Sequence, residues 1–501
     1  MSNNKSSNIL LWLDGGPYSY LNLGIATSLS KFKNFNFYGV VATNQDISFF
    51  TAQKFIQFND LVYYPDCYIK KSSYDLEYLK EVEKKFELNL WLDVYSERFF
   101  HKHRTHFHKF SKDEILIIVE GTIKFFTELI ERVNPEMIIM QTAGENISNL
   151  LLYQLAKKIG IKIIMINAIH IHNKVVLSNN LISREISDEY SKILPNFHNI
   201  EPLHDEDFIK HQSLSETIKV QSDFIFDASN YSQKIKHYFQ RMNNDPEPIY
   251  QNLGKTKSKM IKAKYQFPAM LKKREEFLFS HCIDQIEDEN FIYFPLHTEP
   301  ESKILSTAPF FGNQINVIEN VARSIPMGQI LYVKEHPGQK SKIWRPIEDY
   351  EKILELPNVK LVHPNFNSQK LISNSNAVIS ITGSTGFEAL FYRKPVILFS
   401  DEYYDVVSMV KKIQDIKQLP TIIKNHLANF KFNILELNAL MEATNSCSIS
   451  IPYFSMMKDA LTVSSTQRNS GTTKSIKLFE KFYSANEKHF ELVAKSIDEK
   501  I

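Results

Sequence analysis

Two stretches of the chain alternate short apolar runs with segments of helical periodicity. In the first stretch, the apolar runs that predict buried strands are 9–13, 37–42, 137–141 and 161–166. The segments of helical periodicity beside them are 20–32, 111–133 and 145–159. Ser111 and Glu114 have capping-box spacing, which predicts the start of the second of these helices. Strands that alternate with helices in this way predict βαβ units and a parallel sheet.

The second stretch repeats the alternation more regularly. Its apolar runs are 291–296, 329–333, 359–362, 377–381 and 395–399. The helical segments between them are 312–324, 347–354, 368–373 and 386–392. This pattern predicts a doubly wound α/β domain, whose ligand should lie at the carboxyl ends of the strands.

Residues 180–280 separate the two alternating stretches, and this break indicates where the domains divide. They are rich in Asn, Asp, Ser and Lys, with helical periodicity at 218–242 and no clear buried strand. We expect two Rossmann-like domains that face a cleft, at 1–270 (with a helical insertion at about 180–280) and at 280–430. Residues 431–501 are expected to form a helical segment that packs back on the first domain, because the amphipathic run 475–501 needs an apolar partner.

Composition narrows the class of protein. The 501 residues are 43% hydrophobic and 23% charged, which is typical of a soluble globular chain. A net charge of only +2 gives no support to a nucleic-acid binder that neutralises phosphates. Three scattered cysteines predict no disulfide framework. With no signal peptide and no apolar run of spanning length, we expect a cytoplasmic protein, and peripheral contact with the inner face of the cytoplasmic membrane stays open.

Polar residues follow the first two predicted strands of the second stretch. The residues after the first strand are His297, Glu299 and Glu301. The second strand runs into Lys334, His336 and Pro337. Because the carboxyl ends of parallel strands meet at one edge of a sheet, these side chains are expected beside a bound ligand. His336 is then a cationic or hydrogen-bonding partner for a phosphate oxygen.

A third cluster turns directly from strand into helix. Gly383, Ser384 and Thr385 offer free backbone N–H groups and two hydroxyls at a helix N-terminus, which is a phosphate site assisted by the helix dipole. Glu388, one turn further on, is placed to reach the ribose hydroxyls of a nucleotide. Each cluster also has a structural interpretation, as an exposed histidine, a helix cap or solvated loop charges. Three clusters at successive strand ends of one sheet nevertheless favour a binding site.

The strings YFPLHTEPES, LYVKEHPG and ITGSTGFEALFYRKPVILF resemble the C-terminal domain of bacterial capsule and surface-polysaccharide biosynthesis glycosyltransferases. That group includes the Kdo transferases, and the His-Pro pair is similar to that of the bacterial sialyltransferases. The resemblance covers residues from about 290 to 405. It implies that His336 and Pro337 are the family's His-Pro pair, and that Ser384 and Thr385 are its hydroxylated turn.

The resemblance also implies a fold and an activity. The fold is GT-B, with a nucleotide-sugar donor on the C-terminal domain and a glycan or glycolipid acceptor on the N-terminal one. In these relatives the His and hydroxyl groups hold the donor phosphate, commonly of a CMP-linked acidic sugar such as Kdo or a sialic-acid-like sugar. The analogy favours transfer with inversion. His297 is expected near the sugar or phosphate, with Glu299 or Glu301 ordering the loop.

The first stretch matches that family less well and leaves two candidates for the catalytic base. An inverting transferase needs a carboxylate or imidazole that takes the proton of the acceptor hydroxyl. Glu145 follows a predicted strand and opens a helix, and Asp14 stands in the same place after the first strand. Glu145 is ranked ahead of Asp14 because its strand is the more deeply apolar. Each carboxylate could instead be an ordinary N-cap.

We expect no metal ion and no cofactor. The run from His101 to His108 contains Lys102 and Arg104, whose charges oppose a bound cation. A solvated loop, or a basic patch for an anionic acceptor, fits this run better. The GT-B interpretation requires no metal, because side chains and a helix N-terminus can neutralise the leaving group.

Three other functions are compatible with parts of this pattern. A transferase of polyol phosphate from a CDP-alcohol shares the fold and a His-Pro pair but attacks phosphorus. A nucleotide-sugar 2-epimerase on the same fold needs no acceptor. A non-catalytic scaffold in a glycan-assembly complex has no need of His336, Ser384 and Glu388, so their joint presence argues against it.

Overall fold

The computed structural model describes residues 7–14, 16–101, 107–169, 171, 173–201, 247–342 and 344–500. The predicted helix at 218–242 and most of the His-rich run lie outside them. The described residues divide into two compact units. Unit 1 takes those within 1–181, 247–255 and 448–501, and unit 2 takes those within 182–201 and 256–447.

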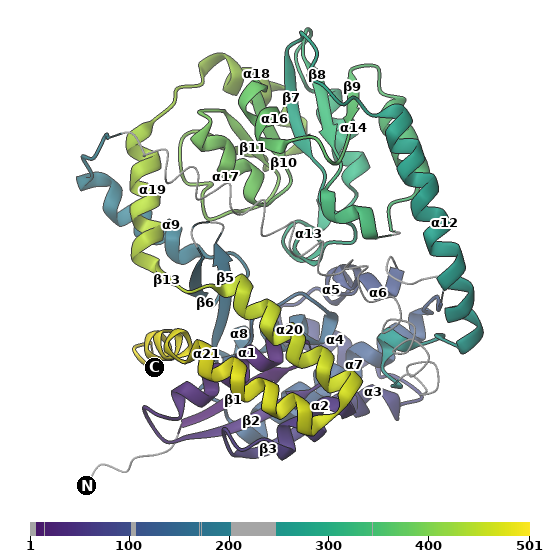
Figure 1. Ribbon diagram of the computed structural model, residues 1–501, viewed down its shortest axis with the longest axis vertical. Coiled ribbons are helices and arrows are strands. Elements are labelled where there is room, and N and C mark those ends of the chain that lie inside the picture. The colour runs from purple at the N-terminus through teal and green to yellow at the C-terminus, as the bar shows by residue number, and fades with distance from the viewer. Residues whose placement is uncertain are drawn as a thin grey trace. The chain divides into compact units, whose positions relative to one another are not determined.

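Within the described residues, unit 1 is built on a seven-stranded sheet with the order β13-β6-β5-β4-β1-β2-β3 (Figure 1). The strands are β1 Ser7–Leu13, β2 Phe35–Val41, β3 Phe58–Tyr63, β4 Met137–Ile139, β5 Lys162–Ile169, β6 Lys174–Ser178 and β13 Ser448–Ser450. β1 to β5 pair in parallel, and the β5–β6 and β6–β13 pairs are antiparallel. The sheet grows in opposite directions from β1, so its topological switch point lies between β1 and β4.

Helices cover both faces of this sheet. They are α1 Pro17–Leu29, α2 Asn44–Ala52, α3 Asp66–Ile69, α4 Leu76–Phe86, α5 Leu90–Ser96, α6 Arg98–His101, α7 Lys112–Val133, α8 Ile147–Ile159, α20 Tyr453–Ser470 and α21 Thr472–Asp498, with a 3-10 turn at Tyr250–Asn252. Ile9, Leu11 and Leu13 of β1 join the core on the side of α1, whereas Leu10 and Trp12 join the core on the side of α7. Successive strand residues point to opposite faces, which is why 9–13 is apolar at every position.

The helix starts follow the capping residues. The predicted capping box is confirmed, because the Glu114 N–H donates to Ser111 Oγ (3.3 Å) and the Ser111 N–H donates to Glu114 Oε2 (2.8 Å). α8 begins at Ile147 rather than at the predicted Glu145, because Asn146 is its N-cap and accepts from the Asn149 N–H (2.9 Å). Glu145 therefore lies in the loop before the helix.

Unit 2 contains a six-stranded sheet among the described residues, in the order β12-β11-β10-β7-β8-β9 and parallel throughout. The strands are β7 Phe291–Pro295, β8 Ile330–Lys334, β9 Val359–Val362, β10 Ala377–Ser380, β11 Val396–Leu398 and β12 Val410–Lys412. The helices are α9 Arg184–Ile193, α12 Lys257–His281, α13 Ser302–Thr307, α14 Gln314–Ala322, α15 Ile347–Leu354, α16 Ser368–Asn374, α17 Ser384–Phe391, α18 Leu419–Asn429 and α19 Ile434–Cys447. Its 3-10 turns are Leu194–Asn196, Pro309–Phe311, η5 Pro337–Ser341 and Ile416–Gln418. The switch point lies between β7 and β10.

Both units therefore have the Rossmann strand order, and the predicted α/β fold of the GT-B class is confirmed. The assignment of the helical segment differs from the prediction. α9 and α12 belong to unit 2 and not to an insertion of the first domain. α9 packs on α19, and buried Arg274 of α12 donates to the Gln339 carbonyl (2.6 Å) in η5. None of the described helices is both long and apolar enough to cross a membrane.

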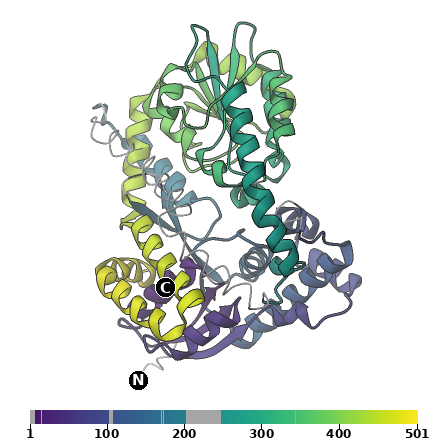
Figure 2. The same cartoon turned by 45° about the vertical axis from the view of Figure 1, so that its right-hand side comes forward.

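The two last helices pack on α1 within unit 1 (Figures 1 and 2). Phe479 and Phe490 of α21 are fully buried in the same core as Leu23 of α1. Gly24 permits this close approach, since a Cβ there would lie 2.4 Å from the Phe490 ring.

Substitution of Gly24 by Ala should destabilise unit 1. Overpacking costs about 1–3 kcal/mol, which exceeds the about 1 kcal/mol that alanine gains over glycine inside a helix. Urea unfolding of Gly24→Ala should show an earlier transition, and Gly24→Ala/Phe490→Leu should recover part of the loss relative to Phe490→Leu alone. A Gly24→Ala protein as stable as the parent would contradict this packing.

Candidate functional site

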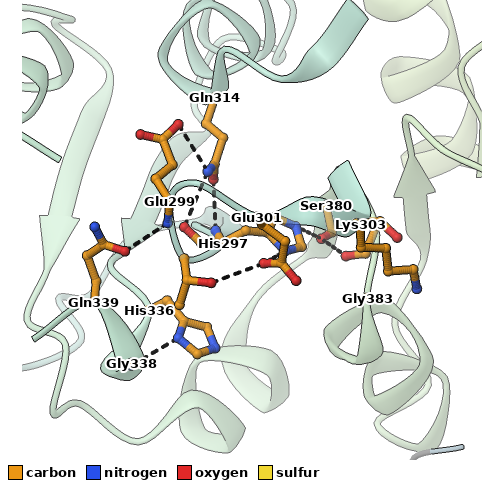
Figure 3. Close-up of polar contacts among 12 residues, drawn as sticks. His297, Glu299, Glu301, Lys303, Gln314, His336, Gly338, Gln339, Ser380 and Gly383 are labelled. Atoms are coloured by element: carbon orange, nitrogen blue, oxygen red, sulfur yellow. Dashed lines mark hydrogen bonds and ion pairs between the residues drawn. The ribbon is translucent and has the colours of Figure 1, made fainter. Parts of the chain in front are cut away.

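The carboxyl ends of β7, β8 and β10 bring the predicted polar clusters of unit 2 together (Figure 3). His297 follows β7, His336 follows β8 and Gly383 follows β10. Ser380 Oγ at the end of β10 lies 3.4 Å from His297 Nε2. A Cβ on Gly383 would lie 3.3 Å from His297 Cε1, so these two loops are in contact across the switch point.

His297 is held through its backbone and is neutral. Its N–H donates to Gln314 Oε1 (2.8 Å), and its carbonyl accepts from Arg345 Nη2 (2.8 Å). Burial, reinforced by the charge of Lys303, lowers the pKa of the imidazole to about 3. His297 can therefore exchange hydrogen bonds with a ligand at neutral pH but brings no positive charge.

Glu299 and Glu301 lie in the loop that carries His297. The Glu299 N–H donates to Gln339 Oε1 (2.8 Å), and its carboxylate accepts from Gln314 Nε2 (3.4 Å). Glu301 Oε2 accepts from Thr298 Oγ1 (3.2 Å) and lies 3.8 Å from His297 Nδ1. Both carboxylates thus stabilise the shape of the loop.

The tautomer of His336 follows from its own turn. The Gly338 N–H donates to His336 Nδ1 (3.0 Å), so Nδ1 carries no proton and the ring proton is on Nε2. Pro337 opens the 3-10 turn η5, which His336 caps. Burial lowers the pKa of His336 to about 4. Of the two predicted roles, a hydrogen-bond donor through Nε2–H therefore fits and a cation does not.

Lys334 supplies the positive charge at this edge of the sheet. It is the last residue of β8 and only 3% exposed. No hydrogen bond or ion pair joins its ammonium to another described residue. Burial lowers the pKa of Lys334 to about 8, while Glu335 and Glu388 oppose this shift. A buried cation of this kind favours an anionic ligand.

Ser384 and Glu388 are bonded to each other on the first turn of α17. Ser384 Oγ donates to Glu388 Oε1 (3.0 Å). Burial raises the pKa of Glu388 to about 7, although Ser384 and Lys334 act in the opposite direction. Thr385, the next residue, is half-buried. The Ser384 hydroxyl can thus donate to a ligand only if Glu388 releases it.

The start of α17 already holds a carboxylate of this chain. Glu402, which is 5% exposed, accepts from the Gly383 N–H (2.7 Å), from Lys303 Nζ (2.7 Å) and from the Thr382 hydroxyl. Burial alone raises the pKa of a carboxyl group, but Lys303 and these hydrogen bonds outweigh it and hold the pKa of Glu402 below its usual value. The Gly383 N–H is therefore not free, contrary to the prediction.

Gly383 has φ +96°, a conformation that a side chain rarely adopts. The N–H groups of Ser384 and Thr385 follow it in the first turn of α17, where no intrahelical acceptor exists. The phosphate-binding capacity of this turn therefore begins at Ser384.

The side chains that support the site were not predicted from the sequence. They are Lys303, Gln314, Glu335, Gln339, Arg345 and Glu402. For Glu402 a signal was available, because it follows the predicted strand 395–399 as the other clusters follow theirs. Gln314, Gln339 and Arg345 come from a helix or from connecting segments, and only the tertiary structure brings them to the strand ends.

Asp14 and Glu145 lie after the two strands that flank the switch point of unit 1. Asp14 Oδ1 is buried and accepts no hydrogen bond from a described residue. Burial raises the pKa of Asp14 to about 7, and the Glu145 carboxylate adds to this. Glu145 Oε2 instead forms an ion pair with Arg98 Nη2 (3.1 Å), which also donates to the Glu145 carbonyl (3.3 Å). The two carboxylates thus have different environments.

In the part of the chain that the structure describes, no three His, Cys, Asp or Glu side chains gather so that they could hold a metal ion.

Comparison with known proteins gives a family match over part of the chain. Residues 197–421 match a family model described as capsule polysaccharide biosynthesis protein. The resemblance to capsule polysaccharide biosynthesis proteins is therefore confirmed over the stretch that contains the unit 2 cluster. The chain is also 26% identical over 132 residues to protein FixF of Sinorhizobium fredii, a match that covers 26% of this chain and 31% of FixF.

The solved structures that align with this chain do so at low sequence identity and low TM-score. The beta Kdo 2,7 transferase KpsC of Thermosulfurimonas dismutans aligns at 14% identity and a TM-score of 0.32, over 63% of this chain and 79% of KpsC. The UDP-GlcNAc 2-epimerase of Neisseria meningitidis, bound to UDP-GlcNAc, aligns at 12% identity and a TM-score of 0.26, over 88% of this chain and 99% of the epimerase.

Glu388 should make the stability of unit 2 depend on pH. The pKa of Glu388 in the folded protein, about 7, lies above the ordinary 4.5. The stabilisation that this group gives to the folded state is therefore complete below about pH 4.5 and is lost as the pH rises through 7. Glu388→Gln should remove this loss and be roughly 1–3 kcal/mol more stable than the parent above pH 7. Thermal unfolding of both proteins from pH 4 to 9 measures the difference. Glu351→Gln, which alters an exposed glutamate, is the control, and parallel pH curves for Glu388→Gln and the parent would contradict the burial of Glu388.

Proposed function

We propose that this chain is a capsule polysaccharide biosynthesis glycosyltransferase that moves a sugar from a nucleotide donor to a growing surface glycan. The donor is a CMP-linked acidic sugar such as Kdo or a sialic-acid-like sugar, and unit 2 holds it. The observation that carries the proposal is the buried Lys334 ammonium, which has no ion-pair partner among the described residues and ends the strand that leads into His336. The family match over 197–421 supports the biosynthetic context.

The polar groups of unit 2 suit the departure of a nucleotide phosphate. Lys334 provides charge, His336 donates through Nε2–H, and the N–H groups of Ser384 and Thr385 point out of the first turn of α17. These groups stabilise negative charge that grows on the leaving phosphate as the glycosidic bond breaks. The proposal therefore includes neither a metal ion nor a cofactor. Glu388 is the partner for the ribose hydroxyls, and it exchanges its bond to Ser384 for them.

We propose Asp14 as the base, ahead of Glu145. A general base works best when its pKa lies near the working pH, and the pKa of Asp14 is raised to about 7. Its buried Oδ1 accepts no hydrogen bond from a described residue, so it is the better acceptor for the proton of the glycan hydroxyl. Glu145 is instead engaged by Arg98 in an ion pair. In the proposed inverting reaction, the hydroxyl oxygen attacks the anomeric carbon as Asp14 takes its proton.

A donor screen tests the function itself. Calorimetry with CMP, CDP, UDP and GDP, followed by assays with the corresponding sugars and with CDP-alcohols, separates the candidates. Transfer from a CMP-sugar supports the proposal. Polyol phosphate transfer, conversion of a UDP-sugar without acceptor, or no nucleotide binding would each replace it with one of the other functions.

His336→Ala should weaken CMP binding about ten- to hundredfold, because a lost hydrogen bond to a charged group costs about 1.5–3 kcal/mol. The fold should be unaffected, since among the described residues the His336 ring forms a hydrogen bond only within its local turn. Calorimetric titration of CMP is the measurement, and His281→Ala, an exposed histidine of α12, is the control. Equal CMP affinity in His336→Ala and the parent would refute the phosphate assignment.

Asp14→Asn should abolish transfer, by about 10²–10⁴-fold, while CMP binding stays almost unchanged. Glu145→Gln should remain active, with its pH optimum moved downward, because the carboxylate that helps to raise the pKa of Asp14 is gone. Initial rates from pH 5 to 9 and CMP titrations of both variants provide the comparison. An inactive glutamine variant beside an active asparagine variant would make Glu145 the base.

A further inference from the structure

A buried ion pair connects the loops of His297 and His336, the two histidines of the unit 2 site. Arg345 is 1% exposed and Glu335 2% exposed, and Arg345 Nε lies 3.2 Å from Glu335 Oε2. Tyr350 OH donates to the same carboxylate oxygen (2.5 Å). Neither charged group reaches the solvent, so neither contacts a ligand directly.

Each partner of this pair holds one histidine-bearing loop by its backbone. Arg345 Nη2 donates to the His297 carbonyl (2.8 Å), and Glu335 Oε1 accepts from the His336 N–H (2.5 Å). The ion pair is therefore a bridge from the end of β7 to the end of β8. Gln314 and Gln339 hold the His297 loop from other sides, through the N–H groups of His297 and Glu299.

Stability alone does not account for this arrangement. Apolar residues of similar size often replace a buried ion pair with no loss of stability. Arg345 Nε and Nη1 are also buried without a hydrogen-bond partner among the described residues, which is unfavourable. What the pair does provide is a fixed separation between the backbones of His297 and His336.

We propose that Arg345 is a positioning residue for the donor site: through Glu335 and the His297 carbonyl, it sets the placement of the His336 and His297 rings relative to each other. This inference rests on the proposed function of the same site. The guanidinium is suited to the task because its rigid plane holds Nη2 against the His297 carbonyl while Nε stays beside Glu335, whereas a lysine ammonium presents a single nitrogen.

Arg345→Lys tests the proposal, because it keeps a positive charge beside Glu335 but loses the planar guanidinium group. CMP affinity should fall about five- to tenfold. In ligand-free protein labelled with ¹⁵N-histidine, the pKa of His336, about 4 in the parent, should rise toward the ordinary 6.5 as the ring gains solvent. His336→Ala assigns the signal.

Two controls separate positioning from stability. Tyr350→Phe removes a hydrogen bond from the same carboxylate but leaves both histidine contacts, so it should lower the melting temperature without changing CMP affinity. Lys360→Met breaks ion pairs to Glu287 and Glu289, and it should change neither the CMP affinity nor the pKa of His336. If CMP affinity falls as much in Tyr350→Phe as in Arg345→Lys, affinity follows stability and the positioning role is wrong.

The ligand-free spectrum keeps this test separate from the proposed function. A parent protein that binds no CMP counts against the proposed function only. An unchanged His336 pKa in Arg345→Lys overturns the positioning role, whether or not the protein binds nucleotide.

Discussion

The order of the parallel strands is the constraint on which both candidate centres depend. Each sheet grows in opposite directions from its first strand, so the connections on the two sides of that strand diverge and leave the carboxyl ends open. In unit 2 this point lies between β7 and β10, where the loops of His297 and Gly383 meet. In unit 1 it lies between β1 and β4, and Asp14 and Glu145 follow these two strands.

Within this framework, burial gives chemically similar groups different roles. His297 and His336 are both neutral, because burial lowers the pKa of each well below 6.5. The same effect raises the pKa of Asp14 and Glu388 to about 7, whereas Lys303 and two hydrogen bonds keep Glu402 ionised. The positive charge at the unit 2 site then comes from Lys334, and the neutral histidines offer directional hydrogen bonds rather than charge.

Much of the fold could be predicted because the sheets are covered on both faces. A strand such as β1 is apolar at every position, and the predicted runs 9–13 and 359–362 coincide with or lie within observed strands. β3, β6, β12 and β13 were missed. β12 and β13 are three-residue edge strands with little apolar character. Helix starts were less accurate where a cap decides them. Asn146 moves the start of α8 beyond Glu145, and Pro17 moves the start of α1 ahead of the predicted Tyr20.

The position of a site residue could be predicted from the sequence where that residue follows a predicted strand. His297, His336 and Ser384 were found in this way. The environment of each residue was not, because it depends on contacts between distant segments. Nothing local in the sequence shows that Glu402 accepts from the Gly383 N–H, or that Arg345 reaches the His297 carbonyl. The proposed order of Asp14 before Glu145 depends partly on the contact of Arg98 with Glu145, which is likewise tertiary.

The path of the chain has a consequence for biosynthesis. Unit 1 is made of segments that precede and follow the unit 2 strands in the chain, since α20 and α21 pack on α1 and α2. During translation, every strand of unit 2 leaves the ribosome before Phe479 and Phe490 have been synthesised. The apolar face beneath these rings stays uncovered throughout that interval. The nascent chain therefore keeps an apolar surface exposed until the last helix docks.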